Sequence, residues 1–148
     1  LANACKEYSL MELEKWIEFQ RLGDERGDLV ALEIGQQQEV PFEIKRVYYI
    51  YRTGEGVSRG FHAHKTLKQV AICISGSCNI ILDDGFSRLD VHLCSPTKGL
   101  LIERFMWREM HSFSENCVLL VLASAHYDES DYIRNYEEFL RVARGHEC

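Results

Sequence analysis

The sequence predicts an all-β fold, a sandwich or jelly-roll barrel, with one short amphipathic helix near its C-terminal end. Three features predict it: short apolar runs of strand length, turn residues between them, and helical spacing of the last apolar residues. The chain has 148 residues, which fits one domain with a substantial core. We expect one domain over residues 1–148: an extension of open structure at 1–23, the barrel at 24–125 and the helix at 128–144.

Eight runs rich in Val, Ile, Leu, Tyr and Cys form the predicted strands. Each run has ordinary strand length, and clusters of Gly, Asp, Asn and Ser separate the runs. The predicted strands are Leu29–Ile34, Ile44–Arg52, Gly60–Lys65, Lys68–Ser75, Cys78–Asp83, Arg88–Leu93, Gly99–Arg104 and Cys117–Ser124.

Two segments depart from this β pattern. Ser9 and Glu12 resemble a capping box, which predicts a short helix over the next residues, although 16–20 fits a strand equally well. Near the other end, Tyr136, Phe139 and other apolar residues recur at helical spacing, with acidic residues before them and basic residues after them. An amphipathic helix that packs on the barrel is expected there.

The composition narrows the class of protein. The net charge of −6 argues against a nucleic-acid polymer as partner, because that affinity rests on Lys and Arg. We see no apolar run of about 18 residues and no secretory signal, so we expect no membrane span and a cytoplasmic protein. The leading residue, Leu1, is typical of a trimmed chain or a piece of a longer polypeptide.

The six cysteines contain no CxxC pair. Four of them lie in or beside apolar strand-like runs, where a small apolar side chain fits the core. We therefore expect buried free thiols, and neither a zinc site nor a set of disulfides.

His62 and His64 are the principal candidate site residues. They lie two positions apart in a predicted strand, so both imidazoles point to the same face. An imidazole with an ordinary pKa near about 6.5 can take and return a proton at neutral pH. The pair therefore predicts acid/base chemistry in a cavity, while two satisfied polar groups inside a barrel remain the plainer interpretation.

The residues that follow the pair bear on a metal site. His62 and His64, then Gln69, then Gly76 have the spacing of the first cupin motif, but Gln69 replaces the glutamate that binds metal in metal cupins. A neutral amide binds a divalent cation weakly, and residues 96–107, where a second motif would lie, contain no histidine. We expect no metal and no other cofactor. A metal-dependent cupin oxygenase or isomerase, with His111 from a predicted loop as third ligand, is the alternative.

Several side chains are candidates to support the pair. Arg46 and Tyr48 share one strand face, so they can line one cavity, where Tyr48 either donates to a substrate oxygen or serves as a wall aromatic. Arg59 and Arg46 can clamp phosphate oxygens, although isolated arginines are more often solvated. Trp107 and Arg108 lie beside a predicted strand end, a common position for pocket residues.

Taken together, these residues resemble the sugar 3,4-ketoisomerases of the WxcM-like group, small cupins that act on dTDP-4-keto-6-deoxyglucose. The resemblance covers about residues 24 to 140, and spans of this length rarely match by chance. The segments that carry it are Asp24–Leu29, Pro41–Ile50, Arg59–Lys65, Leu82–Gly85, Trp107–Met110, Val121–Ser124 and Asp131–Arg134.

The resemblance implies a cofactor-free exchange of a 4-keto for a 3-keto sugar through an enediol, in the synthesis of a deoxyamino sugar for surface glycans such as O-antigen or S-layer chains. It implies that His62 carries the proton and that donors hold the enediolate oxygen. The implied catalytic residues are His62, Tyr48, His64, Arg26 and Arg108. The implied residues that bind the dTDP-linked 4-keto-6-deoxy sugar are Arg46, Arg59, Lys65, Gln69 and Trp107.

The resemblance also implies a homodimer with exchanged N-terminal strands, an arrangement that would close an exposed sheet edge. Producers of the galacto-configured sugar tend to have Arg and His at the positions of Arg26 and Arg108, and gluco producers tend to have Tyr and Arg. This chain has Arg at both positions, which leaves the C4 configuration open. A non-catalytic sugar-nucleotide binding module is a further alternative, and a 3,5-epimerase is another that would need a His–Asp dyad.

Overall fold

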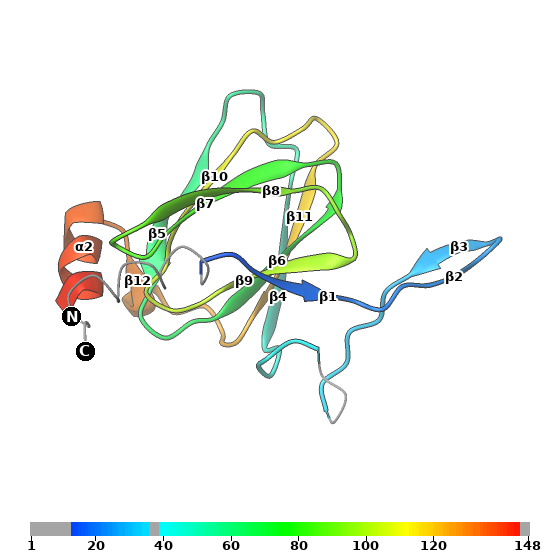
Figure 1. The fold of residues 1–148 in the computed structure, drawn as a ribbon, viewed down its shortest axis with the longest axis horizontal. Coiled ribbons are helices and arrows are strands. Elements are labelled where there is room, and N and C mark those ends of the chain that lie inside the picture. Colours follow the sequence, from blue (N-terminus) through cyan, green and yellow to red (C-terminus); the bar gives the residue numbers. More distant parts are fainter. Residues whose placement is uncertain (1–12, 36–38, 146–148) are drawn as a thin grey trace, which may run out of the picture.

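The computed structural model describes residues 13–35 and 39–145, and its main body is a pair of five-stranded sheets packed face to face (Figure 1). The first sheet has the strand order β1-β9-β6-β11-β4 and the second β12-β5-β10-β7-β8. The first sheet contains β1 (Lys15–Glu18), β4 (Arg46–Tyr51), β6 (Gln69–Ser75), β9 (Lys98–Ile102) and β11 (Val118–Ala123). The second contains β5 (Arg59–His64), β7 (Cys78–Asp83), β8 (Arg88–Leu93), β10 (Trp107–His111) and β12 (Tyr132–Ile133).

The core lies between these two sheets. Its buried residues come from both of them, for example Ile50 and Leu119 from the first sheet and Ile80 and Leu82 from the second. Side chains of β4 alternate between exposed and partly or fully buried, as a half-buried strand requires. The predicted fold class is confirmed: the protein is a β-sandwich of the jelly-roll kind with one short C-terminal helix.

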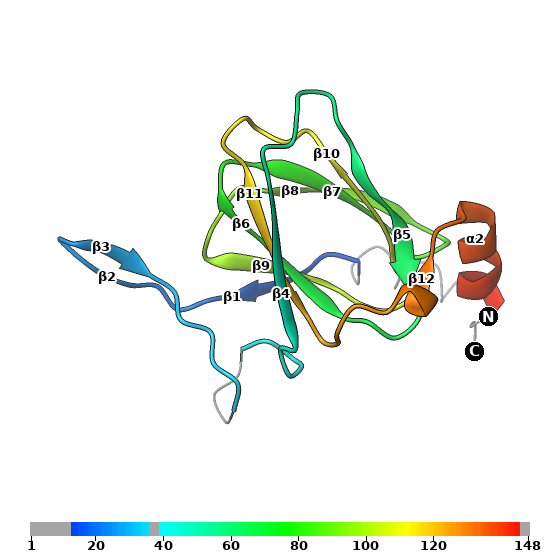
Figure 2. The same cartoon turned by 180° about the vertical axis from the view of Figure 1, so that it is seen from behind.

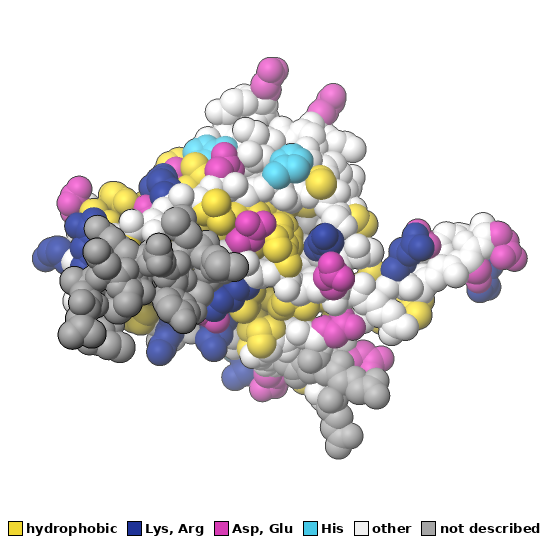
Figure 3. All heavy atoms as spheres, in the orientation of Figure 1, with side chains coloured by type: hydrophobic (Ala, Val, Ile, Leu, Met, Phe, Trp, Pro, Cys, Tyr) yellow, Lys and Arg dark blue, Asp and Glu magenta, His cyan; other side chains and the backbone are white. Residues whose placement is uncertain are grey.

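A separate hairpin projects from the body. It consists of β2 (Leu22–Asp24) and β3 (Gly27–Leu29), and Figures 1 and 2 show it as an arm on the side away from the C-terminal helix. Every residue of its two strands is exposed, and Figure 3 shows side chains of both charges along it. The body of this chain does not bury the hairpin.

Two N-terminal expectations are wrong. The predicted strand Leu29–Ile34 holds only Leu29, because Val30 and Leu32 pack singly against a small core cluster instead of pairing with another strand. The helix predicted after the capping box is wrong for residues 15–18, which form β1 and pair with β9, and the strand alternative is confirmed over 16–18. Ser9 and Glu12 themselves lie outside the described residues. Pairing along an open sheet edge overrode the local helix signal.

The predicted C-terminal helix is confirmed with a later start. Helix α2 spans Tyr136–Gly145, whereas residues 129–131 form a single 3₁₀ turn and Tyr132 begins β12. Tyr132 pairs with His64 of β5, and because residues 132–133 are in this sheet the helix can begin only after them. Phe139 and Ala143 of α2 pack in one cluster with Ala63 of β5 and Trp107 of β10, and Figures 1 and 2 show α2 beside β5 and β12.

Strand β10 corrects a further expectation. Residues 107–111 were predicted to lie near a strand end and in a loop, but they form a strand between β5 and β7. The apolar signal of this strand is weak because Arg108 and Glu109 occupy buried positions in it. No described helix is long and apolar enough to cross a membrane.

A β-bulge in β5 aims the histidine pair. Arg108 of β10 lies opposite His62 and Glu109 lies opposite Gly60, so Phe61 is the extra residue. Gly60 and Phe61 both have positive φ, at 91° and 57°. A Cβ on Gly60 would come within 3.0 Å of the Arg108 carbonyl oxygen, so only glycine fits this close approach.

We predict that Gly60→Ala lowers the free energy of unfolding by about 2 kcal/mol, because it adds both a strained φ and a contact with the β10 backbone. Chemical denaturation measures the change. Gly54→Ala is the matched control, since an added Cβ there meets Val57 at an ordinary 3.5 Å. Equal stabilities for the two variants would contradict the role given to the bulge.

Candidate active site

A cavity of about 370 Å³ opens beside the histidine pair. Strands β4 and β5 form opposite walls, and β10 and the chain from β12 onward close it. It is lined by Arg46, Val47, Tyr48, Ile50, Arg59, Gly60, His62, Met110, Tyr132 and Arg134. Arg46 and Tyr48 line this cavity together, as their place on one strand face predicts.

The two histidines of β5 have different surroundings. Their ring centroids lie 4.9 Å apart with the planes at 88°, and the Tyr132 ring packs against both. His62 lines the cavity, whereas His64 lies behind it with only 1% of its surface exposed. The Nδ1 atom of His64 lies 3.2 Å from a carboxylate oxygen of Asp131, which fixes the ring. His62 is thus the histidine placed to meet a ligand.

Burial and a neighbouring cation keep both imidazoles neutral. The pKa of His62 is lowered to about 4, first by desolvation and then by the charge of Arg108. The pKa of His64 is also lowered, by desolvation, Arg108 and His62, against the opposing pull of Asp131. At neutral pH, His62 therefore has a free lone pair and can act as a base.

A chain of hydrogen bonds runs behind the cavity wall. Gln69 Nε2 donates to Tyr48 Oη over 2.9 Å, and Gln69 Oε1 accepts from Arg108 Nη1. Arg108 also donates to the backbone oxygen of Met106 and is fully buried. Desolvation raises the pKa of Tyr48, so its hydroxyl keeps its proton at neutral pH. Gln69 and Arg108 thus act on the cavity indirectly: Gln69 through its hydrogen bond to Tyr48, and Arg108 through its charge near the histidines.

The cavity mouth is cationic. Arg46, Arg59 and Arg134 all line it, and guanidinium groups match the geometry of phosphate oxygens. Arg134 lies over the Tyr132 ring at 4.2 Å and is held by Glu129 over 2.8 Å. The arrangement suits an anionic ligand that also offers a flat surface.

The remaining candidates lie elsewhere in this chain. Arg26 is on the hairpin, 85% exposed and paired with Asp24, away from His62. The Lys65 amino group donates to the Ser130 backbone oxygen and does not line the cavity. Trp107 is buried, donates to Glu109 over 3.0 Å and packs against α2. The structure therefore brings His62, Tyr48, Arg46 and Arg59 together, with His64, Gln69 and Arg108 directly behind.

Three residues at the site are not among those predicted from the sequence: Tyr132 and Arg134, which line the cavity, and Asp131, which lies behind His64. All three lie within the helix predicted at 128–144, and that prediction does not place them at the cavity. The signal that could have found them was their place in one of the segments that carry the family resemblance.

The donor set around the histidines is unlike that of a metal cupin. Gln69 is engaged with Arg108, whose buried positive charge repels a divalent cation at this point. Among the described residues, three side chains that could bind a metal ion lie close together at one place: Cys73, Cys78 and Cys117, in the core between the sheets. Burial raises the pKa of Cys117 to about 11, whereas the hydrogen bond with Cys78 lowers the pKa of Cys73 to about 7.

The four described cysteines are free. Cys73, Cys78 and Cys117 are buried, as expected, and Cys94 is exposed, which corrects the expectation for that residue. Cys94 alternates with the inward-facing Leu93 at the end of β8.

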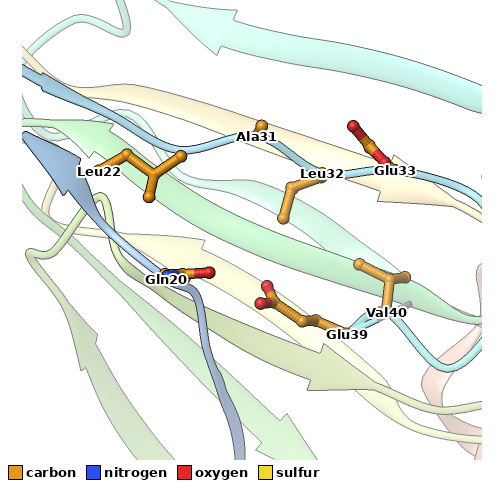
Figure 4. A pocket seen from close by; sticks show the side chains of 7 residues that line it. All are labelled: Gln20, Leu22, Ala31, Leu32, Glu33, Glu39 and Val40. Atoms are coloured by element: carbon orange, nitrogen blue, oxygen red, sulfur yellow. The ribbon is translucent and has the colours of Figure 1, made fainter. Parts of the chain in front are cut away.

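A second cavity, of about 210 Å³, lies where the chain enters and leaves the hairpin (Figure 4). Its side chains come from both segments and from the chain around Val40: Gln20, Leu22, Ala31, Leu32, Glu33, Glu39 and Val40. The charged groups that line it are carboxylates, so it repels phosphate. It is not a site for an anionic ligand.

The fold and the site together define a class: a jelly-roll protein in which a neutral histidine and a protonated tyrosine hydroxyl line a cavity with a cationic mouth. The sequence matches the family described as FdtA, WxcM-like, C-terminal, over residues 12–144. It is 52% identical over 125 residues to the TDP-4-oxo-6-deoxy-alpha-D-glucose-3,4-oxoisomerase of Aneurinibacillus thermoaerophilus, covering 84% of this chain and 88% of that one. The chain belongs to this WxcM-like family.

Solved structures of sugar 3,4-ketoisomerases have the same fold as this chain. The sugar 3,4-ketoisomerase QdtA of Thermoanaerobacterium thermosaccharolyticum, in complex with TDP, matches with a TM-score of 0.88 and 42% identity over 94% of this chain and 100% of that one. The WlaRB TDP-quinovose 3,4-ketoisomerase of Campylobacter jejuni matches with a TM-score of 0.82 and 53% identity over 88% of this chain and 98% of that one.

We predict that His62 makes stability depend on pH. Its folded pKa lies below that of an unfolded histidine, so the unfolded chain binds the proton first as pH falls. Stability from this group is complete above about pH 6.5 and falls by about 2 kcal/mol down to pH 4.5. Chemical denaturation of the wild type and of His62→Asn should differ in pH dependence by this amount. Parallel pH profiles would show that His62 is not buried in its neutral form.

Proposed function

We propose that this protein is a sugar-nucleotide 3,4-ketoisomerase that converts TDP-4-keto-6-deoxyglucose into the TDP-3-keto-6-deoxyhexose without a metal. The observation that carries the proposal is that a neutral His62 and the protonated Tyr48 hydroxyl line the same cavity, which has an arginine-rich mouth. The family and the relatives support it over a metal-dependent cupin or a binding module without activity. We place the reaction in the cytoplasm, in the synthesis of deoxyamino sugars.

The chemistry needs only proton movement. His62 removes the hydrogen from C3, which is acidic because the C4 carbonyl is adjacent, and the electrons form a C3=C4 double bond while O4 takes the negative charge. The Tyr48 hydroxyl donates to this oxygen, and the buried Arg108 charge lowers the energy of the anion. O3 then loses its proton and O4 gains one, so that the C3 carbonyl and the C4 hydroxyl form. The protonated His62, whose proton exchanges with solvent, gives a proton to C4 and becomes neutral again. The product is an isomer, so no oxidant is required.

The arginines bind the rest of the substrate. A diphosphate carries negative charge on several oxygens, which Arg46, Arg59 and Arg134 can meet at the cavity mouth. Tyr132 lines the same cavity, and its ring offers a flat surface that a base can contact. We propose that His62 and Tyr48 act on the sugar, that His64 and Arg108 support them from behind the cavity wall, and that the mouth arginines hold the diphosphate.

A homodimer explains the exposed hairpin. The apolar side chains of Leu22 and Leu29 are about half exposed on the arm, as are Val47, Tyr49 and Tyr51 on the outer face of the edge strand β4. A second copy of the chain would cover such surfaces. We propose that the hairpins are exchanged and that the partner subunit's Arg26 reaches the cavity that Arg26 of the same chain does not.

The catalytic proposal predicts that the protein converts TDP-4-keto-6-deoxyglucose in deuterated water and that deuterium enters the sugar at the carbon that is protonated. His62→Asn keeps the shape of the side chain and removes the base, so kcat should fall at least about 100-fold. NMR follows C3 and C4, and calorimetry with TDP shows that the variant still binds.

An active His62→Asn variant would remove His62 from the mechanism. An inactive wild type that binds TDP would instead favour a binding module.

The dimer proposal predicts complementation. Arg26→Ala and His62→Asn proteins, each weak alone, should regain about one quarter of the wild-type rate when co-expressed, because half of the dimers are mixed and each mixed dimer has one intact site. The control pair is Tyr48→Phe with His62→Asn, whose defects lie in the same chain's cavity and should not complement. No recovery in the first pair, or a monomer by light scattering, would contradict exchange.

A further inference from the structure

The hydrogen bonds behind the cavity wall have a fixed direction. A guanidinium group has donors only, so the atom of Gln69 that faces Arg108 must be its amide oxygen. The amide nitrogen of Gln69 then faces Tyr48, and it donates to the phenol oxygen over 2.9 Å. Arg108 therefore determines which way round the Gln69 amide lies.

This direction decides what Tyr48 can do. Among the described residues, Gln69 is the one hydrogen-bond partner of the Tyr48 hydroxyl, and the hydroxyl oxygen is the acceptor in that bond. The single proton of the hydroxyl is therefore left to point into the cavity that Tyr48 lines. Tyr48 is presented to a ligand as a donor.

Neither partner behind Tyr48 is placed to touch the ligand. Gln69 is 2% exposed and Arg108 is fully buried, and neither lines the cavity beside His62. The sequence suggested that Gln69 binds substrate, but its contacts are to Tyr48 and Arg108. Its effect on a reaction must pass through Tyr48 or through Arg108.

We propose that Gln69, oriented by Arg108, is a positioning residue that keeps Tyr48 as a hydrogen-bond donor to the oxygen that becomes negative during isomerisation. The inference rests on the proposed function and deepens it. It gives a reason for an amide at the position where metal cupins have a carboxylate. A glutamate at position 69 would have only acceptors, and it would draw the Tyr48 proton away from the cavity towards itself.

The kinetic test is a double-mutant cycle between Gln69→Glu and Tyr48→Phe. Gln69→Glu should lower kcat about 100-fold with little change in KM, as loss of an oxyanion donor does. In the Tyr48→Phe background the same change should alter kcat by less than about threefold, because the hydroxyl on which it acts is gone. Asn116→Asp, the same chemical change on an exposed turn, is the matched control and should leave kcat unchanged.

Full activity of Gln69→Glu, or equal losses in both backgrounds, would overturn the positioning role while leaving the ketoisomerase assignment intact. Retained TDP binding by Gln69→Glu shows that the variant is folded. An inactive wild type would overturn the proposed function instead, and the direction of the hydrogen bond is then decided without turnover.

That second measurement is fluorine NMR of protein labelled with 3-fluorotyrosine. The labelled Tyr48 should have a higher pKa in Gln69→Met than in the wild type, because methionine removes a donor that stabilises the phenolate. A lower pKa in Gln69→Met would show that Tyr48 donates to Gln69, and it would refute the proposal.

Discussion

The site depends on one buried positive charge. Arg108 is fully buried in the middle of the second sheet, and its hydrogen bonds among the described residues go to two neutral oxygens, of Gln69 and Met106. Burial lowers its pKa to about 10, so it stays charged at neutral pH. A charge of this kind is costly to bury, and its energy falls when an anion forms nearby. Arg108 is therefore an uncompensated positive charge before the reaction, and the negative charge of the proposed enediolate would be stabilised by it.

The same charge sets the states of the other site residues. It helps to keep His62 and His64 neutral, so that a base is available at the pH of the cell. It also fixes the Gln69 amide and, through it, the donor role of Tyr48. The jelly roll supplies the geometry, because β10 carries Arg108 between the histidine strand β5 and β7. The bulge at Phe61 then lets His62 lie opposite Arg108.

The sequence predicted much of this arrangement because local spacing contains it. Alternation along β4 placed Arg46 and Tyr48 on one face, and the two-residue spacing placed His62 beside His64. The sequence could not show that Arg108 is interior, since a charged residue in a short strand gives no apolar signal. It could not place Tyr132 either, because apolar helical spacing continued into a segment that pairs with β5. The position of Arg26 relative to a cavity depends on which surface covers the exposed hairpin, and the sequence of one chain does not determine that surface.

The central claim is that a protein base, without a metal, removes the C3 hydrogen. The most direct measurement is the isotope effect on kcat/KM for TDP-4-keto-6-deoxyglucose deuterated at C3, before and after dialysis against a chelator. The account predicts a normal primary isotope effect of the same size in both samples, and no measurable turnover by His62→Asn. Activity that is lost on dialysis and returns with iron, manganese or zinc would contradict it.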